Sequence, residues 1–445
     1  MSRYKRYERY KDSGVEWIGE IPEHWNNKKI SWIFNIIGSG TTPSTSNLEY
    51  YDGDVPWVNT GDLNDGYLYE TSKMITDLAL KDYSTLKFYP IDTLLIAMYG
   101  ATIGKLSITK IIATTNQACC ALAQPKNVNI KFIFYWFLAN RNHIIAMAYG
   151  GGQPNISQNL IKSLRINLPE KHEQNAIVNF LDQKTAVIDG LIADKEKLIE
   201  LLQEKRQAII TEAVTKGLNP NVRMKDSGIE WIGEIPEHWN VEPIKYMVKT
   251  IQTGTTPTTK NDDYFDGDIQ WFTPGDFHGS KELYEASRKI SNLAVIDNEA
   301  RLFPKNTVMI VGIGATVGKV AKLGVEGSFN QQITGLIVNE QRLNCDYLYY
   351  WLYINQETIK NISNYTTLPI INNEFVKNFE CLSLPLDEQQ AIVNYLNQKT
   401  SEIDDLILKI RLQIQKLKEY RQSLISEAVT GKIDVREFGS ISEVI

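Results

Sequence analysis

The chain has 445 residues, 43% of them hydrophobic and 22% charged, a composition typical of a globular protein with two to four domains. No apolar run is long enough to span a bilayer, and the N-terminal residues lack an apolar signal-peptide stretch, so we expect a cytoplasmic protein without a membrane partner. The net charge of −6 counts against nucleic-acid binding, although one basic face can coexist with an acidic total.

The first distinctive stretch is KDSGVEWIGEIPEHW at residues 11–25, which returns as KDSGIEWIGEIPEHW at residues 225–239. Further segments match at the same spacing or one residue more. They are GTTP at 40–43 and 254–257, GATxGK at 100–105 and 314–319, Asn-Gln at 116–117 and 330–331, and EAVT at 212–215 and 427–430. The sequence therefore predicts two homologous halves.

Residues 12–170 read as an α/β or β-rich domain, and the repeat predicts a second such domain in the other half. Residues 93–98 and 104–112 resemble short strands bounded by turn residues, 132–148 reads as a buried helix, and 164–168 as a closing strand. We predict globular domains over residues 1–170 and 218–385.

Each half ends with a long amphipathic helix, predicted over residues 171–217 and 386–432. Positions such as Ile188, Leu191 and Leu198, or Ile403, Leu406 and Ile410, step by four and three, which is typical of a coiled-coil seam. Solvated single helices are the alternative. A pseudo-two-fold relation between the halves would make the paired helices antiparallel, about 66 Å long for some 44 residues each, roughly two turns of B-DNA. The tail from residue 432, assigned as segment 433–445, is predicted to pack little and to be partly disordered.

Catalytic and metal-binding motifs fail on inspection. The GATxGK segments have one residue too few between their glycines for a phosphate loop, and Lys105 and Lys319 are not followed by Ser or Thr. The four cysteines, Cys119, Cys120, Cys345 and Cys381, lack metal-ligand spacing and are predicted to be buried thiols. We therefore expect no catalytic residue and no metal site.

The repeated motifs together resemble one family, the DNA-specificity subunits of type I restriction–modification systems. The resemblance rests on KDSGxEWIGEIPEHW, on GATxGK followed by Asn-Gln, and on a long helix that is entered through LPxxEQxAIVxxL and ends in EAVTGK. The entry motif stands at residues 168–181, with one extra residue, and at 384–396; the first helix ends TKG where the second keeps TGK. The match covers nearly the whole chain.

The resemblance implies an α/β (α+β) fold with two pseudo-two-fold-related globular target-recognition domains, separated by two long antiparallel coiled-coil helices. Each domain would read one half of a bipartite double-stranded DNA target, and the helices would set the gap. The subunit itself would be non-catalytic and hold no cofactor. It would recruit two methyltransferase subunits that bind S-adenosylmethionine and two restriction (motor-nuclease) subunits that use ATP and magnesium.

Base recognition needs side chains at base edges, with phosphate contacts fixing register, so the divergent loops 60–72, 150–158, 273–287 and 365–373 are candidates. The candidate DNA-binding residues are Thr41, Thr42, Asn64, Lys105, Gln153, Asn155, Gln158, Thr255, Thr256, Arg288 and Lys319. Turn formation or capping is the alternative role for each of them. Two other functions stay open: the recognition subunit of a related fused restriction enzyme, and a two-headed scaffold that does not bind DNA.

Overall fold

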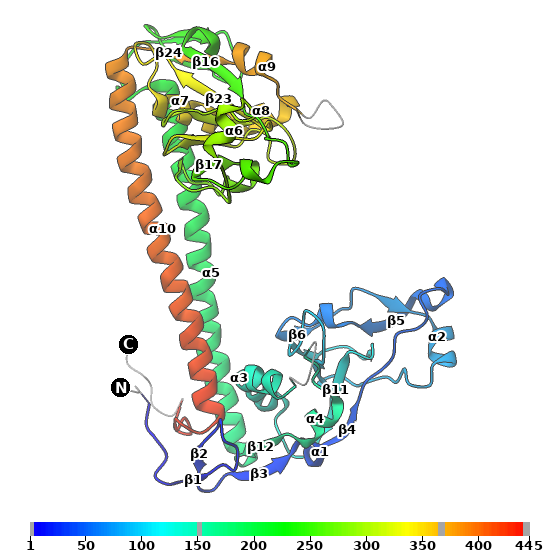
Figure 1. The fold of residues 1–445 in the computed structure, drawn as a ribbon. Coiled ribbons are helices and arrows are strands. Elements are labelled where there is room, and N and C mark those ends of the chain that lie inside the picture. The colour runs from blue at the N-terminus through cyan, green and yellow to red at the C-terminus, as the bar shows by residue number, and fades with distance from the viewer. Residues whose placement is uncertain (1–3, 149–153, 364–369, 439–445) are drawn as a thin grey trace. The chain divides into compact units, whose positions relative to one another are not determined.

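The computed structural model describes residues 4–148, 154–363 and 370–438 (Figure 1). The chain forms two compact units. Unit 1 contains Met1–Glu196 together with Arg411–Ile445, and unit 2 contains Lys197–Ile410. Each unit therefore holds one globular head and parts of both long helices. Among the described residues, no helix is both long and apolar enough to cross a membrane.

The head of unit 1 is built on a five-stranded sheet in the order β4-β11-β8-β9-β6, antiparallel except where β6 joins β9. A three-stranded sheet, β10-β5-β7, lies in the same head. The strands are β4 (Phe34–Gly38), β5 (Tyr51–Val58), β6 (Gly66–Leu68), β7 (Met74–Ile75), β8 (Leu94–Ala97), β9 (Leu106–Thr109), β10 (Thr114–Thr115) and β11 (Cys119–Pro125). Central strands β8 and β9 are buried at every residue, as expected for strands covered on both faces.

Helices and two short ribbons complete this head. The helices are α1 (Ile30–Ile33), η1 (Leu48–Tyr50), η2 (Thr60–Asp62), α2 (Asp77–Asp82), α3 (Ile130–Met147) and α4 (Gln158–Ser163). The ribbons are β1 (Tyr10–Asp12) with β2 (Glu20–Pro22), and β3 (Asn26–Lys29) with β12 (Arg165–Leu168). The strands predicted at 93–98, 104–112 and 164–168 and the helix at 132–148 are thus confirmed as β8, β9, β12 and α3.

The head of unit 2 repeats the same topology, with sheets β16-β23-β20-β21-β18 and β19-β17-β22. Its strands are β13 (Met224–Asp226), β14 (Glu234–Pro236), β15 (Asn240–Pro243), β16 (Val248–Thr253), β17 (Ile269–Phe272), β18 (Glu282–Leu283), β19 (Arg288–Ile290), β20 (Val308–Val311), β21 (Val320–Leu323), β22 (Gly327–Phe329), β23 (Ile333–Val338) and β24 (Glu380–Ser383). Its helices are η3 (Ile244–Tyr246), η4 (Asp262–Tyr264), η5 (Pro274–Asp276), α6 (Asn292–Ile296), α7 (Cys345–Ile354), α8 (Gln356–Ser363) and α9 (Asn373–Asn378). The predicted internal repeat is therefore a repeat of fold.

The two predicted long helices are α5 (Lys171–Lys216) and α10 (Leu386–Val429). In unit 1 they run antiparallel, because Asp189 pairs with Arg421 at 2.8 Å and Lys195, further along α5, donates to Gln413, earlier in α10. In unit 2, Arg206 of α5 pairs with Asp404 of α10 at 3.1 Å. The antiparallel pairing expected from the repeat is confirmed.

The seam between the helices differs in part from the predicted one. Ile188, Ile403 and Ile410 are buried as expected, but Leu191, Leu198 and Leu406 are each 44% exposed. Next to Leu191 and Leu406, Ile192 and Ile407 are buried instead, at 9% and 7% exposed, while Ile199, next to Leu198, is half-buried. Leu-Ile occurs as an adjacent pair at 191–192, so spacing alone fits either member of that pair, and side-chain packing selects the isoleucine.

The repeated EHW motif fixes each head to the start of a long helix. In unit 1 the buried carboxylate of Glu173, in the first turn of α5, accepts from the Trp25 indole at 3.1 Å and lies 2.8 Å from Nε2 of His24. In unit 2, Glu388 of α10 makes the matching contacts with Trp239 at 2.9 Å and His238 at 2.8 Å. A carboxylate is also favoured at a helix N-terminus, so the motif has a structural role in both units.

The described part of the C-terminal tail, up to residue 438, packs more closely than predicted. Ile433 and Val435 are only 1% and 3% exposed, and the ring of Phe438 lies 4.8 Å from that of Phe180 in α5. The prediction that the tail from residue 432 packs little was wrong for residues 432–438, because their partners lie far away in sequence. Residues 439–445 lie outside the described part.

Candidate nucleic-acid interface

The loop after β4 in unit 1 is held in one conformation by contacts with β5 and β10. A Cβ on Gly40 would lie 1.7 Å from the carbonyl oxygen of Thr115, so only glycine fits. Its backbone N–H donates to Thr115 Oγ1 at 2.9 Å, and the indole of Trp57 donates to the carbonyl of Thr41 at 3.1 Å. These contacts hold Thr41 and Thr42 at the surface.

Thr42 donates its hydroxyl hydrogen bond to the side-chain oxygen of Gln117, which is exposed. The preceding Asn116 shapes the turn, since its side-chain oxygen accepts from the N–H groups of Ala118 and Cys119 at 3.1 and 3.0 Å. The Thr42 bond uses the oxygen of the Gln117 amide and leaves its NH2 group, which carries two N–H donors. No described residue accepts from that group.

Unit 2 repeats this arrangement, except that the Gly254 N–H donates to the carbonyl of Ile333 at 3.0 Å and not to a side chain. A Cβ on Gly254 would lie 2.0 Å from the carbonyl oxygen of Phe329, and the Trp271 indole donates to the Thr255 carbonyl at 3.1 Å. Thr256 again donates to the side-chain oxygen of an exposed glutamine, Gln331. The two Thr–Gln pairs are therefore a shared surface feature of the heads.

Two matched aspartates close the divergent loops at 60–72 and 273–287. Asp62 accepts from the N–H of Asn59 at 2.8 Å and of Ser72 at 3.1 Å. Asp276 accepts from the N–H of Thr273 at 2.7 Å and of Ser287 at 2.8 Å. Each aspartate thus ties the start of its loop to its end.

The protonation state of Asp276 favours this role. Burial alone would raise the pKa of the Asp276 carboxyl, but the backbone N–H groups of Thr273 and Ser287 hold that pKa below its usual value. The ionised carboxylate therefore persists at neutral pH, and it keeps the loop closed.

The candidate lysines occupy matched turns but differ in their contacts. Lys105 is half-buried, and its side-chain ammonium makes no ion pair or hydrogen bond with a described residue. Lys319 is exposed and donates to the carbonyl of Phe277 at 3.3 Å. The turn of Lys105 adjoins that of Asn64, since Leu106 accepts from the N–H of Asp65 at 2.8 Å.

Several other candidates have local structural roles. Asn64 is exposed, but its side-chain oxygen accepts from Gly66 N–H and Ser107 Oγ, each at 3.0 Å. Gln158 donates to the carbonyl of Ile37 at 2.8 Å, and Thr255 Oγ1 accepts from the N–H of Arg301 at 3.1 Å. These contacts match the alternative of turn formation and capping.

The remaining candidates differ in their surroundings. Asn155 is exposed, and Arg288, also exposed, lies on edge strand β19 beside a hollow of about 400 Å³ that Phe265 and Lys289 help to line. Gln153 lies outside the described residues. Within each head, the structure brings the threonines of the GTTP loop together with a glutamine that the candidate set lacks. The repeat of Asn116-Gln117 at 330–331 was the available signal for it.

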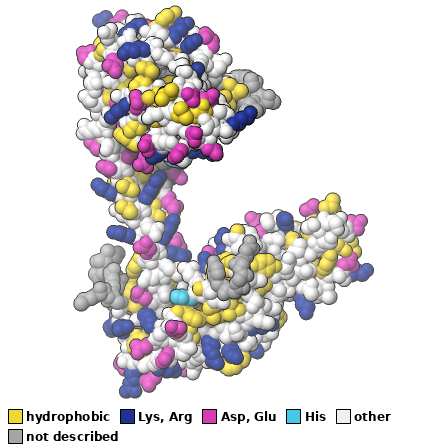
Figure 2. All heavy atoms as spheres, viewed as in Figure 1, with side chains coloured by type: hydrophobic (Ala, Val, Ile, Leu, Met, Phe, Trp, Pro, Cys, Tyr) yellow, Lys and Arg dark blue, Asp and Glu magenta, His cyan; other side chains and the backbone are white. Residues whose placement is uncertain are grey.

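Charge and metal ligands give less guidance. On the face shown in Figure 2, lysine and arginine side chains are interspersed with acidic ones over each head. No group of three or more potential metal ligands occurs among the described residues. Cys119, Cys120 and Cys381 are buried and Cys345 is half-buried, and burial raises the pKa of the Cys120 thiol to about 12.

Comparison with known proteins places both halves in one family. The model of the type I restriction modification DNA specificity domain matches residues 22–201 and again residues 236–416. The MjaVIII specificity subunit of Methanocaldococcus jannaschii is 22% identical over 434 residues, covering 94% of each chain. The StySPI specificity subunit of Salmonella potsdam is 22% identical over 432 residues, covering 93% of this chain and 90% of that one.

Solved structures show the same fold. A chain from a study of complex assembly and conformational transition in the type I R-M system aligns with a TM-score of 0.71 at 15% identity, covering 92% of this chain and 98% of that one. The HsdS subunit from Thermoanaerobacter tengcongensis aligns with a TM-score of 0.52, also at 15% identity, covering 93% of this chain and 98% of that one. With two matched domains, the chain belongs to the family of the type I restriction modification DNA specificity domain.

Proposed function

We propose that the chain is the subunit that gives a type I restriction–modification complex its DNA specificity, with each head reading one half of a bipartite duplex. The observation that carries this proposal is that the two heads share the same set of surface contacts but have loops of different sequence. The Thr–Gln pairs and loop-closing aspartates recur in both, while the loops they support differ in sequence. Two heads with the same supporting contacts but different loops are suited to bind two DNA half-sites of different sequence.

The shared groups suit the DNA backbone, because a group present in both heads cannot distinguish two different half-sites. The free amide N–H groups of Gln117 and Gln331 are donors for phosphate oxygens, and Lys105 and Lys319 add positive charge. The candidate base-reading groups are those that differ between heads: Asn155 in unit 1 and Arg288 in unit 2. Asn presents a donor and an acceptor to adenine, and Arg presents two donors to guanine.

The expected partners follow from the family. Two methyltransferase subunits would bind S-adenosylmethionine and methylate adenine, and two restriction subunits would use ATP and magnesium. In this proposal the chain itself is non-catalytic, holds no cofactor, and supplies recognition and assembly. The recognition subunit of a related fused enzyme would use the same heads in the same way, so the partner genes distinguish these two possibilities.

Methylome sequencing tests the proposal directly. A host expressing this chain with its methyltransferase subunit should carry a split, adenine-methylated motif that disappears when this gene is deleted. Replacing residues 12–170 with the corresponding segment of a relative should change one half of that motif and leave the other half unchanged. A soluble complex that produces no deletion-dependent motif would contradict the proposal and favour the two-headed scaffold.

A further inference from the structure

The two units differ at the place where one long helix ends and the other begins. In unit 1 this is the end of α10 beside the start of α5, and in unit 2 it is the end of α5 beside the start of α10. In unit 1, both ends of the chain cover the first turns of α5. Tyr7 donates its hydroxyl to Glu173 at 2.7 Å, Phe438 packs on Phe180, and the guanidinium of Arg436 lies 5.0 Å from the Tyr7 ring. The Glu173 side chain is consequently only 2% exposed, and Phe180 is fully buried.

In unit 2 the homologous walls are covered by a single segment, residues 217–223, which links α5 to β13. Glu388, the counterpart of Glu173, has a side chain 36% exposed, and Tyr395, the counterpart of Phe180, is 37% exposed. Leu218 is the counterpart of Ile433 in the sequence repeat, yet Leu218 is 44% exposed and Ile433 only 1%. Unit 1 therefore has two segments over these walls, and unit 2 has only one.

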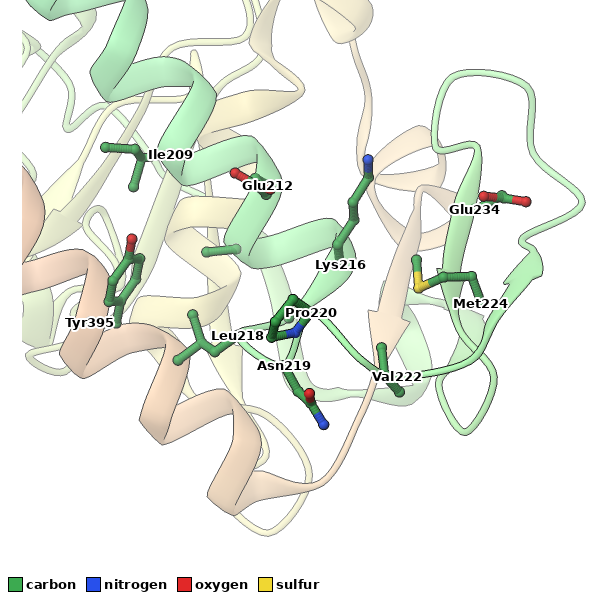
Figure 3. Close-up of a pocket in the computed structure, with 12 residues that line it drawn as sticks. Ile209, Glu212, Lys216, Leu218, Asn219, Pro220, Val222, Met224, Glu234 and Tyr395 are labelled. Atoms are coloured by element: carbon green, nitrogen blue, oxygen red, sulfur yellow. The ribbon is translucent and has the colours of Figure 1, made fainter.

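Without a second covering segment, unit 2 has two adjoining hollows of about 610 and 280 Å³ at this position. We call the two hollows together the linker groove. Figure 3 shows the larger one, with Ile209 and Glu212 of α5 and Tyr395 of α10 on one side and Met224 and Glu234 on the other. Val222 lines both hollows, and Glu388, His238 and Trp239 line the smaller one.

The walls of the linker groove define the chemistry of an occupant. Tyr395 and Leu218 offer apolar surface. Among the described residues that line the two hollows, the three carboxylates of Glu212, Glu234 and Glu388 outnumber the one lysine, Lys216, and His238 lies 2.8 Å from Glu388. In unit 1 the homologous walls hold Tyr7 and Phe438 beside the cation Arg436. The matching occupant is an extended segment with an aromatic side chain next to a lysine or arginine.

We propose that the linker groove of unit 2 is a docking site for such an aromatic, basic segment of the methyltransferase subunit, and that unit 1 has no equivalent because the chain's own ends fill it. The identity of this partner rests on the proposed function. A second copy of the chain is disfavoured as occupant because its own ends are engaged. Asp434 donates its backbone N–H to Lys5 at 2.8 Å, and Ile433 and Val435 are buried.

The proposal predicts that two methyltransferase subunits bind by unequal contacts. The full-length chain is titrated with the purified methyltransferase subunit, and both binding steps are followed by native mass spectrometry. Val222→Tyr fills the groove and Tyr395→Ala removes its aromatic wall. Each should weaken one binding step about tenfold or more and leave the other unchanged. Tyr420→Ala, which removes a 49%-exposed tyrosine of α10 in unit 1, is the matched control and should change neither step.

Circular dichroism checks that each variant is folded, and Tyr395→Phe, which keeps the ring, should bind like the parent chain. Unchanged binding by both Val222→Tyr and Tyr395→Ala would overturn the groove proposal while leaving the proposed function intact. Equal weakening of both steps would also overturn it. If the parent chain binds no methyltransferase subunit at all, the proposed assembly fails together with the groove.

Discussion

At the scale of single residues, the same carboxylate has two different environments. Glu173 is buried and receives bonds from Tyr7 and Trp25 and a contact from His24, whereas Glu388 lacks the tyrosine and is partly exposed. Removing a carboxylate leaves its donors unpaired, and the free-energy cost grows with their burial.

Glu173→Ala should therefore lower the free energy of unfolding of unit 1 by about 3 kcal/mol. Glu388→Ala should lower that of unit 2 by about 1 kcal/mol. Urea denaturation followed by hydrogen exchange in each unit measures both values. Equal losses would show that the covering by the chain ends contributes nothing to the Glu173 interaction.

The shared surface groups of unit 1 predict separable effects on DNA binding. Lys105→Ala removes a charge and should reduce the slope of log K against log salt by about 1, because one fewer counterion is released. Gln117→Ala removes a neutral donor and should weaken binding to all duplexes alike without changing the slope. Affinity measured from about 50 to 200 mM salt separates the two; a changed methylation motif in either variant would argue against a backbone contact.

These residues also show what sequence reasoning can reach. The glycine and threonine of the GTTP loop were identifiable because they recur in both halves. Gln117 recurs as well, but nothing in its neighbourhood in the sequence indicates that it meets Thr42, which lies 75 positions away. Asn64 and Gln158 were selected for amide chemistry suited to adenine, and the structure shows both amides hydrogen-bonded within their own head.

At the scale of elements, the long helices were predictable because their heptad pattern is local. The exact seam was not, because adjacent Leu-Ile pairs such as 191–192 fit two neighbouring registers. The chosen seam leaves Leu191 exposed on α5 in unit 1 and Leu406 exposed on α10 in unit 2.

If the length of the helix pair sets the gap between the two half-sites, lengthening both helices should lengthen that gap. Inserting four residues, about 6 Å, into one helix alone would shift α5 against α10, so the pairing of the two helices calls for a matched change in both. Seven residues added after Glu196 and seven after Ile410 keep the heptad and add about 10 Å, or roughly three base pairs. The methylated motif should keep both half-sites and gain that spacing; an unchanged gap would refute this role of the helix pair.

At the scale of the whole molecule, the two halves repeat the same fold, but the start of the long helix is covered by two chain segments in unit 1 and by one in unit 2. Both heads have the same sheet orders, and both attach to a long helix through Trp–Glu and His–Glu contacts. The residues near the two chain ends break the symmetry. This was beyond sequence reasoning because Phe438 meets Phe180, and Asp434 meets Lys5, across more than 250 positions. The short tail was predicted to pack little because these partners cannot be read from the neighbouring sequence.

Deleting residues 433–445 tests whether the packing of the tail stabilises unit 1. The loss of the buried side chains Ile433 and Val435 should lower the free energy of unfolding of unit 1 by about 3 kcal/mol, and unit 2 should be unaffected. Thermal unfolding with limited proteolysis reports the two units separately. Deletion of residues 439–445 alone is the matched control, and an unaltered unit 1 in the longer deletion would restore the original prediction.

The division of unit 1 between the two ends of the sequence also sets an order of events during synthesis. Unit 2 is one continuous stretch, Lys197–Ile410, and has every residue it needs before the last part of α10 is made. The first head is translated earliest, yet Phe180 and Glu173 stay without their tail contacts until Arg436 and Phe438 leave the ribosome. The half of the protein that is begun first is thus completed last. During that interval it exposes apolar surface that chaperones bind and that makes partly made chains prone to aggregate.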